Sequence, residues 1–261
     1  MFPLEKATCS SNCGILATSA FSLHGCSWSP IIRSLPPLST CRKARAGYFC
    51  TMPTQPEIKR AIVFIDGQNL FHAVRKAFGY TYPNFDPLKL AGAICKKYDW
   101  SLQGVRFYTG VPDIDDDAAW HHFWSSKKLT MLHTGVHVYT RPLRYRNKSI
   151  TLPDGTVHTI LVGEEKGIDV RIALDIINLA HKREYNVALV LSQDQDLSEV
   201  ADELRIITKE QNRWIKIASA FPYSPTVKNT RGINNTEWVK IDRSMYDACL
   251  DPKDYRLKSE H

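Results

Sequence analysis

Two short stretches of this chain place aspartates directly behind apolar runs. Residues 191–196 read LSQDQD and follow the run VALVL, while residues 61–66 read AIVFID and end in Asp66. Aspartate is a poor strand former and is costly to bury unless its charge is compensated. Carboxylates held at such positions suit the binding of a divalent metal ion, because the ion supplies the compensating charge.

A third carboxylate lies in the helix predicted over residues 165–182. The apolar stripe of that helix consists of Ile172, Ala173, Ile176, Leu179 and Ala180. Asp169 precedes the first two members by three and four residues, so it shares their face and is expected to point inward. Asp175 lies off that face, and we expect it to be a solvated charge.

Like charges that converge on one pocket repel each other strongly unless a cation compensates them. Neither cysteine nor histidine joins the set Asp66, Asp169, Asp194 and Asp196, and oxygen ligands of this kind predict Mg²⁺ or Mn²⁺. Taken singly, an aspartate behind a strand is more often a helix N-cap, which is the alternative for Asp194 and Asp196. The four together favour a metal site.

Apolar runs alternate with helical patterns from residue 60 onward, which is typical of a parallel sheet covered by helices on both faces. The predicted strands are 61–66, 104–109, 135–141, 187–192, 214–218 and 238–241. The predicted helices are 68–78, 87–98, 115–131, 165–182 and 195–211. Sites in open parallel sheets form at the carboxyl ends of the strands, where Asp66, Asp194 and Asp196 are expected.

Residues 143–162 interrupt this alternation and predict an inserted β-hairpin, because polar and apolar residues alternate around Pro153-Asp154-Gly155. Basic and aromatic residues lie just before this segment and in its first half, namely Arg141, Arg144, Tyr145, Arg146 and Lys148. They form either a basic arm that contacts a phosphate backbone or an exposed edge whose charges prevent aggregation. The neighbouring aromatic residues Trp120, Phe123 and Trp124 are expected in the core or at an interface rather than in a base-stacking platform.

The first 51 residues differ from the rest of the 261-residue chain. They hold five of its seven cysteines and carry +4 of its net charge of +7, so the remainder is only mildly basic. Such a basic, serine-rich leader is typical of an organellar transit peptide, and the alternative is an extended gene model with translation starting at Met52. We expect a disordered leader (1–51), one domain (52–250) and a C-terminal tail (251–261).

Three segments in this order and spacing resemble the signature segments of NYN domains, a branch of the PIN-like nucleases. The segments are FIDGQNLFHAV (64–74), EEKGIDVRIALD (164–175) and LSQDQDLSEV (191–200). The resemblance covers about residues 60–241 and implies an α/β fold, a three-layer α/β/α PIN-like (Rossmann-like) domain with a central, mostly parallel sheet. The residues that match the family's motif are Asp66, Asn69, Asp169, Asp194 and Asp196.

The resemblance implies a ribonuclease dependent on Mg²⁺ or Mn²⁺ that leaves a 5′-phosphate, with single-stranded or structured RNA as its partner. Asn69, Ser192 and Lys166 are expected to support the carboxylates or the substrate phosphate, although capping, loop and ion-pair roles fit them equally. Gln193 departs from the family pattern, in which glycine is common. The alternative function is a non-catalytic RNA-binding or scaffolding protein.

The expectations for the cellular context follow from the same observations. Sheets of this class often pair, so a homodimer is an expected assembly. No run of about 18 apolar residues predicts a membrane span, and 43% hydrophobic residues are enough for a sizeable core, so we expect a soluble globular protein. The location is cytoplasmic, or organellar if the leader is a transit peptide.

Overall fold

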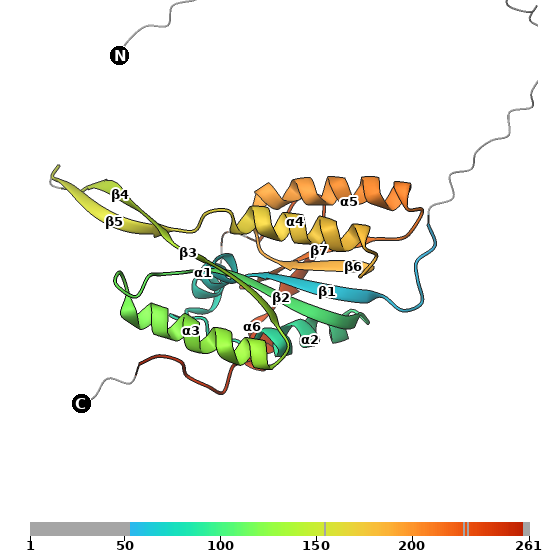
Figure 1. Ribbon diagram of the computed structural model, residues 1–261, viewed down its shortest axis with the longest axis horizontal. Helices are drawn as coiled ribbons and strands as arrows, with labels where there is room; N and C mark the ends of the chain where they lie inside the picture. Colours follow the sequence, from blue (N-terminus) through green and yellow to red (C-terminus); the bar gives the residue numbers. More distant parts are fainter. Residues whose placement is uncertain (1–52, 154, 227, 229, 258–261) are drawn as a thin grey trace, which may run out of the picture. The chain divides into compact units, whose positions relative to one another are not determined.

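The computed structural model describes residues 53–153, 155–226, 228 and 230–257 (Figure 1). Its central sheet has six strands, in the order β3-β2-β1-β6-β7-β8, and every neighbouring pair is parallel. The strands are β1 (Arg60–Asp66), β2 (Ser101–Val111), β3 (His137–Pro142), β6 (Val187–Leu191), β7 (Lys216–Pro222) and β8 (Glu237–Ile241). The predicted α/β class is confirmed.

Helices cover both faces of this sheet (Figure 1). The helices are α1 (Gly67–Phe78), α2 (Pro87–Lys97), α3 (Ala118–His133), α4 (Ile168–His181), α5 (Ser198–Glu210) and α6 (Arg243–Asp247), with a 3₁₀ turn η1 (Gln195–Leu197) before α5. Ala61, Val63 and Ile65 of β1 pack with α1, α2 and α3, whereas Ile62 and Phe64 pack with α4 and α5. This two-residue alternation between two cores explains why β1 is apolar throughout.

The pairing of the central strands determines which chain ends lie together. Asp66 of β1 lies opposite Tyr108 of β2, and Ile65 lies opposite Leu191, the last residue of β6. Parallel strands end at the same edge of a sheet. The segments that follow β1 and β6 are therefore neighbours at this edge.

The inserted hairpin is also present as predicted. Strands β4 (Arg144–Thr151) and β5 (Val157–Glu164) form a separate antiparallel pair that extends away from the central sheet (Figure 1). Its turn is closed by a hydrogen bond from the Leu152 amide to the Thr156 carbonyl, 2.8 Å long, and Asp154 of the predicted turn lies outside the described residues. Most of its side chains are exposed.

Two sequence-based predictions about α4 were wrong. The helix begins at Ile168 rather than at 165, because Gly167 has a left-handed backbone (φ +73°) that cannot continue a helix toward its N-terminus. Asp175 is buried rather than solvated, since only 4% of it is exposed. The helix lies across β2 as well as β1, so the covered part of its surface is wider than the apolar stripe.

Asp175 serves as the acceptor of a buried polar cluster. Its carboxylate accepts a hydrogen bond from the Tyr108 hydroxyl (2.8 Å) and forms ion pairs with Arg171 (2.8 Å) and Arg106 (3.5 Å). Asp175→Ala is expected to lower the free energy of unfolding by about 2–3 kcal/mol, because a buried hydroxyl and two guanidinium groups lose their acceptor. Urea unfolding measures this loss. Asn178→Ala, at an exposed position of the same helix, is the control, and equal stability of the two variants would contradict the assignment.

The C-terminal segment packs onto the domain up to Tyr255, which is 4% exposed. Phe85 and Leu250 form an isolated antiparallel bridge, and Asp251 pairs with Lys127 of α3. Within the part of the chain that the structure describes, no helix is long and apolar enough to cross a membrane. The predicted leader (1–51) lies outside the described residues.

Candidate active site

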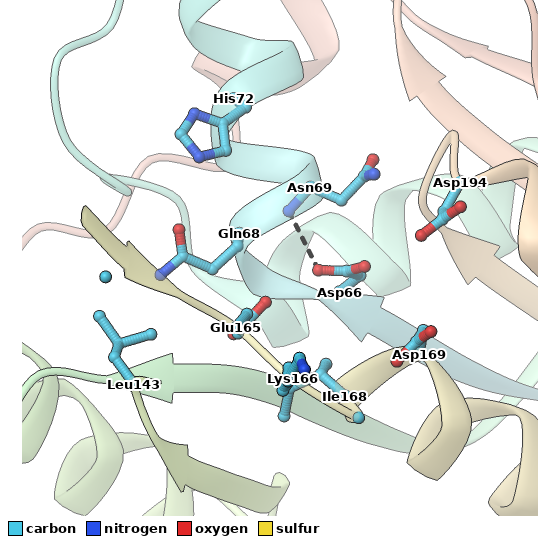
Figure 2. A pocket seen from close by; sticks show the side chains of 12 residues that line it. Asp66, Gln68, Asn69, His72, Leu143, Glu165, Lys166, Ile168, Asp169 and Asp194 are labelled. Carbon is cyan, nitrogen blue, oxygen red and sulfur yellow. Dashed lines mark hydrogen bonds between the residues drawn. The ribbon is translucent and has the colours of Figure 1, made fainter. Parts of the chain in front are cut away.

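A pocket of about 450 Å³ opens at the carboxyl edge of the sheet, between the ends of β1 and β6 and the start of α4 (Figure 2). The residues that line it are Asp66, Gln68, Asn69, His72, Leu143, Gly163, Glu165, Lys166, Gly167, Ile168, Asp169 and Asp194. Three of the four predicted aspartates are therefore brought together by three different segments. Glu165 adds a fourth carboxylate to the pocket.

Asp66 is the most buried carboxylate of the pocket, with 6% of the residue exposed. It is the last residue of β1 and the N-cap of α1, and its Oδ1 accepts a 3.0 Å hydrogen bond from the Asn69 amide. Burial raises its pKa to about 6, the nearby charges of Asp194 and Asp169 add to the rise, and the bonds from the Asn69 amide and the Ser192 hydroxyl oppose it. The Asp66 side chain thus both caps helix α1 and lines the pocket.

Glycine at position 67 lets α1 start directly behind Asp66. A Cβ at this position would lie 2.7 Å from the Phe107 ring and 3.0 Å from the Tyr108 carbonyl oxygen, both on β2. Any side chain would therefore push the start of the helix away from the sheet. The close approach holds Asp66 at the sheet edge.

The loop behind β6 is tied to α1 by Asn69. The Asn69 side-chain oxygen accepts a 2.9 Å hydrogen bond from the Gln193 amide, and the Ser192 hydroxyl accepts one of 3.1 Å from the Asp194 amide. Asp194 caps the short η1 turn through its Oδ1, which accepts from the Asp196 amide (3.1 Å). Asn69 and Ser192 thus set the position of Asp194 relative to Asp66.

The predicted site residues Asp196, Arg144 and Arg146 do not line this pocket. Asp196 is exposed in the η1 turn. Arg144 and Arg146 are exposed on β4, and Arg146 forms a loose ion pair with Glu164 (3.8 Å). Gln193 does not narrow the pocket either, because its side-chain amide donates to the Arg231 carbonyl at 2.7 Å.

Glu165 is a pocket residue that sequence reasoning missed. It lies in the loop before α4, and its carboxylate accepts a short hydrogen bond from the Gly110 amide at the end of β2. Burial, together with the nearby charges of Asp66 and Asp169, raises its pKa to about 8. The signal was present in the segment EEKGID, where Gly167 marks the helix start and so leaves Glu165 in the loop.

Lys166 and Asp169 flank the left-handed residue Gly167. Lys166 is exposed at the rim of the pocket, and its carbonyl accepts a 3.2 Å hydrogen bond from Arg141. Asp169 is half-buried in the first turn of α4, as its place before the apolar stripe predicted. Lys166 therefore offers a positively charged side chain at the mouth of a pocket that is otherwise acidic.

The carboxylates around the pocket fit a hard divalent cation by their donor chemistry. Figure 2 shows Asp66, Glu165, Asp169 and Asp194 around the same space. Burial is the main cause of the raised pKa values of Asp66 and Glu165, and repulsion from neighbouring carboxylates adds to both; a cation in the pocket would relieve that repulsion. Across the described ranges, however, no three Asp, Glu, His or Cys side chains are gathered closely enough to hold a metal ion as they stand.

The parallel three-layer fold and the acidic pocket at its carboxyl edge define a PIN-like α/β protein. The NYN domain matches residues 60–234, and the chain belongs to this family of the PIN-like nuclease superfamily. Its members are generally nucleases and usually use divalent metals. The match spans the segments that carry Asp66, Asp169 and Asp194.

Solved structures give only weak likenesses. A crystal structure of a protein of unknown function from Vibrio parahaemolyticus is 19% identical, with a TM-score of 0.44, and the match covers 73% of this chain and 98% of that one. MurG of Acinetobacter baumannii is 8% identical over 70% of this chain and 45% of its own, with a TM-score of 0.28. A comparison with curated proteins found no match.

Proposed function

We propose that the protein is a ribonuclease that hydrolyses RNA phosphodiester bonds with Mg²⁺ or Mn²⁺ held by its carboxylates. The observation that carries this proposal is the convergence of Asp66, Asp169 and Asp194 on one pocket at the carboxyl edge of the sheet. The membership of the NYN family supports the same chemistry. Glu165, which the sequence reasoning did not include, completes the acidic lining.

Each side chain has a role that its position supports. Asp66, Asp169 and Asp194 would hold the cation, which when bound activates water and neutralises charge on the phosphate oxygens. Asn69 keeps the Asp194 loop against α1, and Glu165 holds the end of β2 through the Gly110 amide. Lys166, exposed at the rim, is placed to pair with a phosphate of the substrate.

The exposed hairpin supports RNA as the substrate. Arg144 makes no hydrogen bond or ion pair with its side chain within the described residues, and the ion pair of Arg146 is both loose and exposed. Two such cations on an arm that extends from the domain suit the backbone of a bound strand. Neither arginine lines the carboxylate pocket, so we assign both to binding rather than to chemistry.

A second function is favoured by one specific observation. The carboxylates of the described part are not gathered at the spacing of metal ligands, and Asp196 is exposed. A protein that binds RNA without cutting it is compatible with this arrangement. The two functions differ in whether RNA is cleaved, which a single assay decides.

The deciding experiment compares the full-length wild-type chain with Asp194→Asn on labelled RNA in EDTA, Mg²⁺ and Mn²⁺. We expect cleavage in either metal, none in EDTA, and about a hundredfold loss in Asp194→Asn, because a ligand charge is removed while the cap is kept. Glu199→Gln, an exposed acid on α5, is the matched control and should cleave like the wild type. RNA binding without cleavage by the wild type would favour the binding protein.

A further inference from the structure

A second pocket, of about 480 Å³, lies beside the carboxylate pocket. Gln68, Leu143 and Gly163 line both pockets, so the two adjoin each other. The carboxylates give the first pocket its proposed role in catalysis, but none of them lines the second pocket. Its volume falls within the range of about 300–1,000 Å³ that is usual for small-ligand sites.

Aromatic side chains from three elements line this second pocket: Phe71 of α1, Trp120 and Trp124 of α3, and Tyr145 of β4. The Phe71 and Trp120 rings are tilted by 54° with centroids 6.3 Å apart. Trp120 also packs edge-on against Phe123 at 5.1 Å, which anchors it to the core. Because these side chains are held in place, little side-chain conformational entropy is lost when a flat ligand stacks on them.

The hairpin forms one wall of this pocket. Tyr145 lies next to Asp116 of the loop before α3, and partial desolvation together with Asp116 raises the pKa of its hydroxyl. At the junction of the two pockets, a Cβ on Gly163 would lie 3.1 Å from both Leu143 and the Tyr145 ring. The absent side chain therefore lets the Tyr145 ring lie against β5.

Trp120, Phe123 and Trp124 all pack in or against the core, but they differ in how far the core covers them. Phe123 and Trp124 are 2% and 4% exposed, respectively. Trp120 is only partly buried and lines the open pocket. Both tryptophans line the pocket, and Trp120 is the more exposed of the two.

Charged groups of both signs border the aromatic surface. Arg75 of α1 is exposed, and its side chain has no hydrogen-bond or ion-pair partner within the part of the chain that the structure describes. Asp116 and Asp117, at the start of α3, line the same pocket. A nucleotide matches this combination, because it offers a flat base with N–H donors and an anionic phosphate.

We propose that this aromatic pocket binds an unpaired base of an RNA strand whose neighbouring phosphate lies at the carboxylate pocket. The proposal deepens the proposed ribonuclease function and rests on it for the position of the strand. A base within a duplex is stacked on both sides and paired at its edge, so it cannot enter a pocket walled by three elements. The substrate class that follows is RNA with at least one unpaired nucleotide beside the cleaved bond.

The test measures binding by fluorescence anisotropy in Mg²⁺, with Asp194→Asn as the full-length parent so that the RNA stays intact. The probes are a labelled 12-nucleotide single strand of mixed sequence and the same strand annealed to its complement. We expect the single strand to bind at least tenfold more tightly than the duplex. Adding Trp120→Ala should weaken single-strand binding about tenfold, while Trp120→Phe should retain most of it.

Two matched control variants distinguish the loss of a binding contact from a general loss of folding. Leu129→Ala changes an exposed residue of the same helix and should leave binding unchanged. Arg75→Ala should lower the slope of log affinity against log salt by about one, whereas Lys76→Ala, its exposed neighbour, should not. Equal affinity for strand and duplex, normal binding by Trp120→Ala, or no RNA binding by the parent would each overturn the proposal.

The outcome is independent of whether the protein cleaves RNA. A wild-type chain that does not cut RNA, together with the expected binding pattern, would overturn the ribonuclease and leave the base pocket standing. A wild-type chain that cuts RNA, together with normal binding by Trp120→Ala, would overturn the pocket alone.

Discussion

Replacement of Asp66 by asparagine is expected to lower the rate of RNA cleavage by about a thousandfold and, at the same time, to stabilise the metal-free protein at neutral pH. The activity falls because Asp66 is the most buried carboxylate of the pocket and faces both Asp169 and Asp194. The fold is kept because asparagine has nearly the same shape and is a good N-cap for α1.

The gain in stability follows from the pKa of Asp66. Because folding raises this pKa from 3.8 to about 6, the folded state binds the proton more tightly than the unfolded state. Stability therefore falls as the pH rises between about 4 and 6, and above that window the ionised group costs about 3 kcal/mol. Asparagine carries no charge, so the variant avoids this cost above pH 6 and has no advantage at pH 4.

Thermal unfolding in EDTA at pH 4.5 and pH 8, together with a cleavage assay in Mg²⁺, tests both parts of this prediction. The variant should unfold at a clearly higher temperature than the wild type at pH 8, and this difference should shrink to about a third at pH 4.5. A variant that is less stable at pH 8 would show that Asp66 is compensated in the folded protein. A variant that cleaves normally would remove Asp66 from the chemistry.

Asp251→Ala is expected to cause a larger loss of stability than the other substitutions considered, about 3–5 kcal/mol. Its partner Lys127 has a side chain that is 0% exposed, with the ammonium 3.0 Å from Asp251 and 2.8 Å from the Phe85 carbonyl. Burial lowers the pKa of Lys127, and the Asp251 carboxylate opposes that shift. Without Asp251, the ammonium must either lose its proton or remain buried without a counter-charge.

Urea unfolding of Asp251→Ala, compared with Asp254→Ala, measures this effect. Asp254 pairs with Arg256 at the surface, at 2.7 Å, and its removal should leave the unfolding midpoint unchanged. Adding Lys127→Met to Asp251→Ala should recover part of the lost stability, because no charge is then buried. A double variant as unstable as the single one would show that packing of residues 249–255, and not charge, causes the loss.

Several features of this fold were predictable because they depend on local patterns. The six strands appear where apolar runs predicted them, and the hairpin appears around Pro153-Asp154-Gly155. The order of strands at the sheet edge was not predictable in detail, but the rule that parallel strands end at one edge was enough to bring Asp66 and Asp194 together. Asp169 followed from helical periodicity.

The residues that were missed or misplaced depend on distant contacts. Asp175 was taken for a solvated charge because its partners Tyr108 and Arg106 come from β2, about 70 positions away along the chain. Glu165 was overlooked because the predicted helix began at residue 165, although Gly167 marks its start, and because its contact with the Gly110 amide of β2 is a long-range one. That Trp120 stays partly exposed while Phe123 and Trp124 are buried depends on which face of α3 the core covers, and sequence proximity does not show this.

The sequence by itself determined the parallel α/β class, the helical face of Asp169, the strand-end positions of Asp66 and Asp194, and the family. These depend on period, spacing and residue type, which are local quantities. Only the tertiary structure decided that Glu165 joins the pocket, that Asp196 stays exposed, and that the hairpin brings Tyr145 to Phe71 and Trp120. Burial and the pKa shifts that follow from it depend on which distant segments pack together, and a local pattern does not encode that choice.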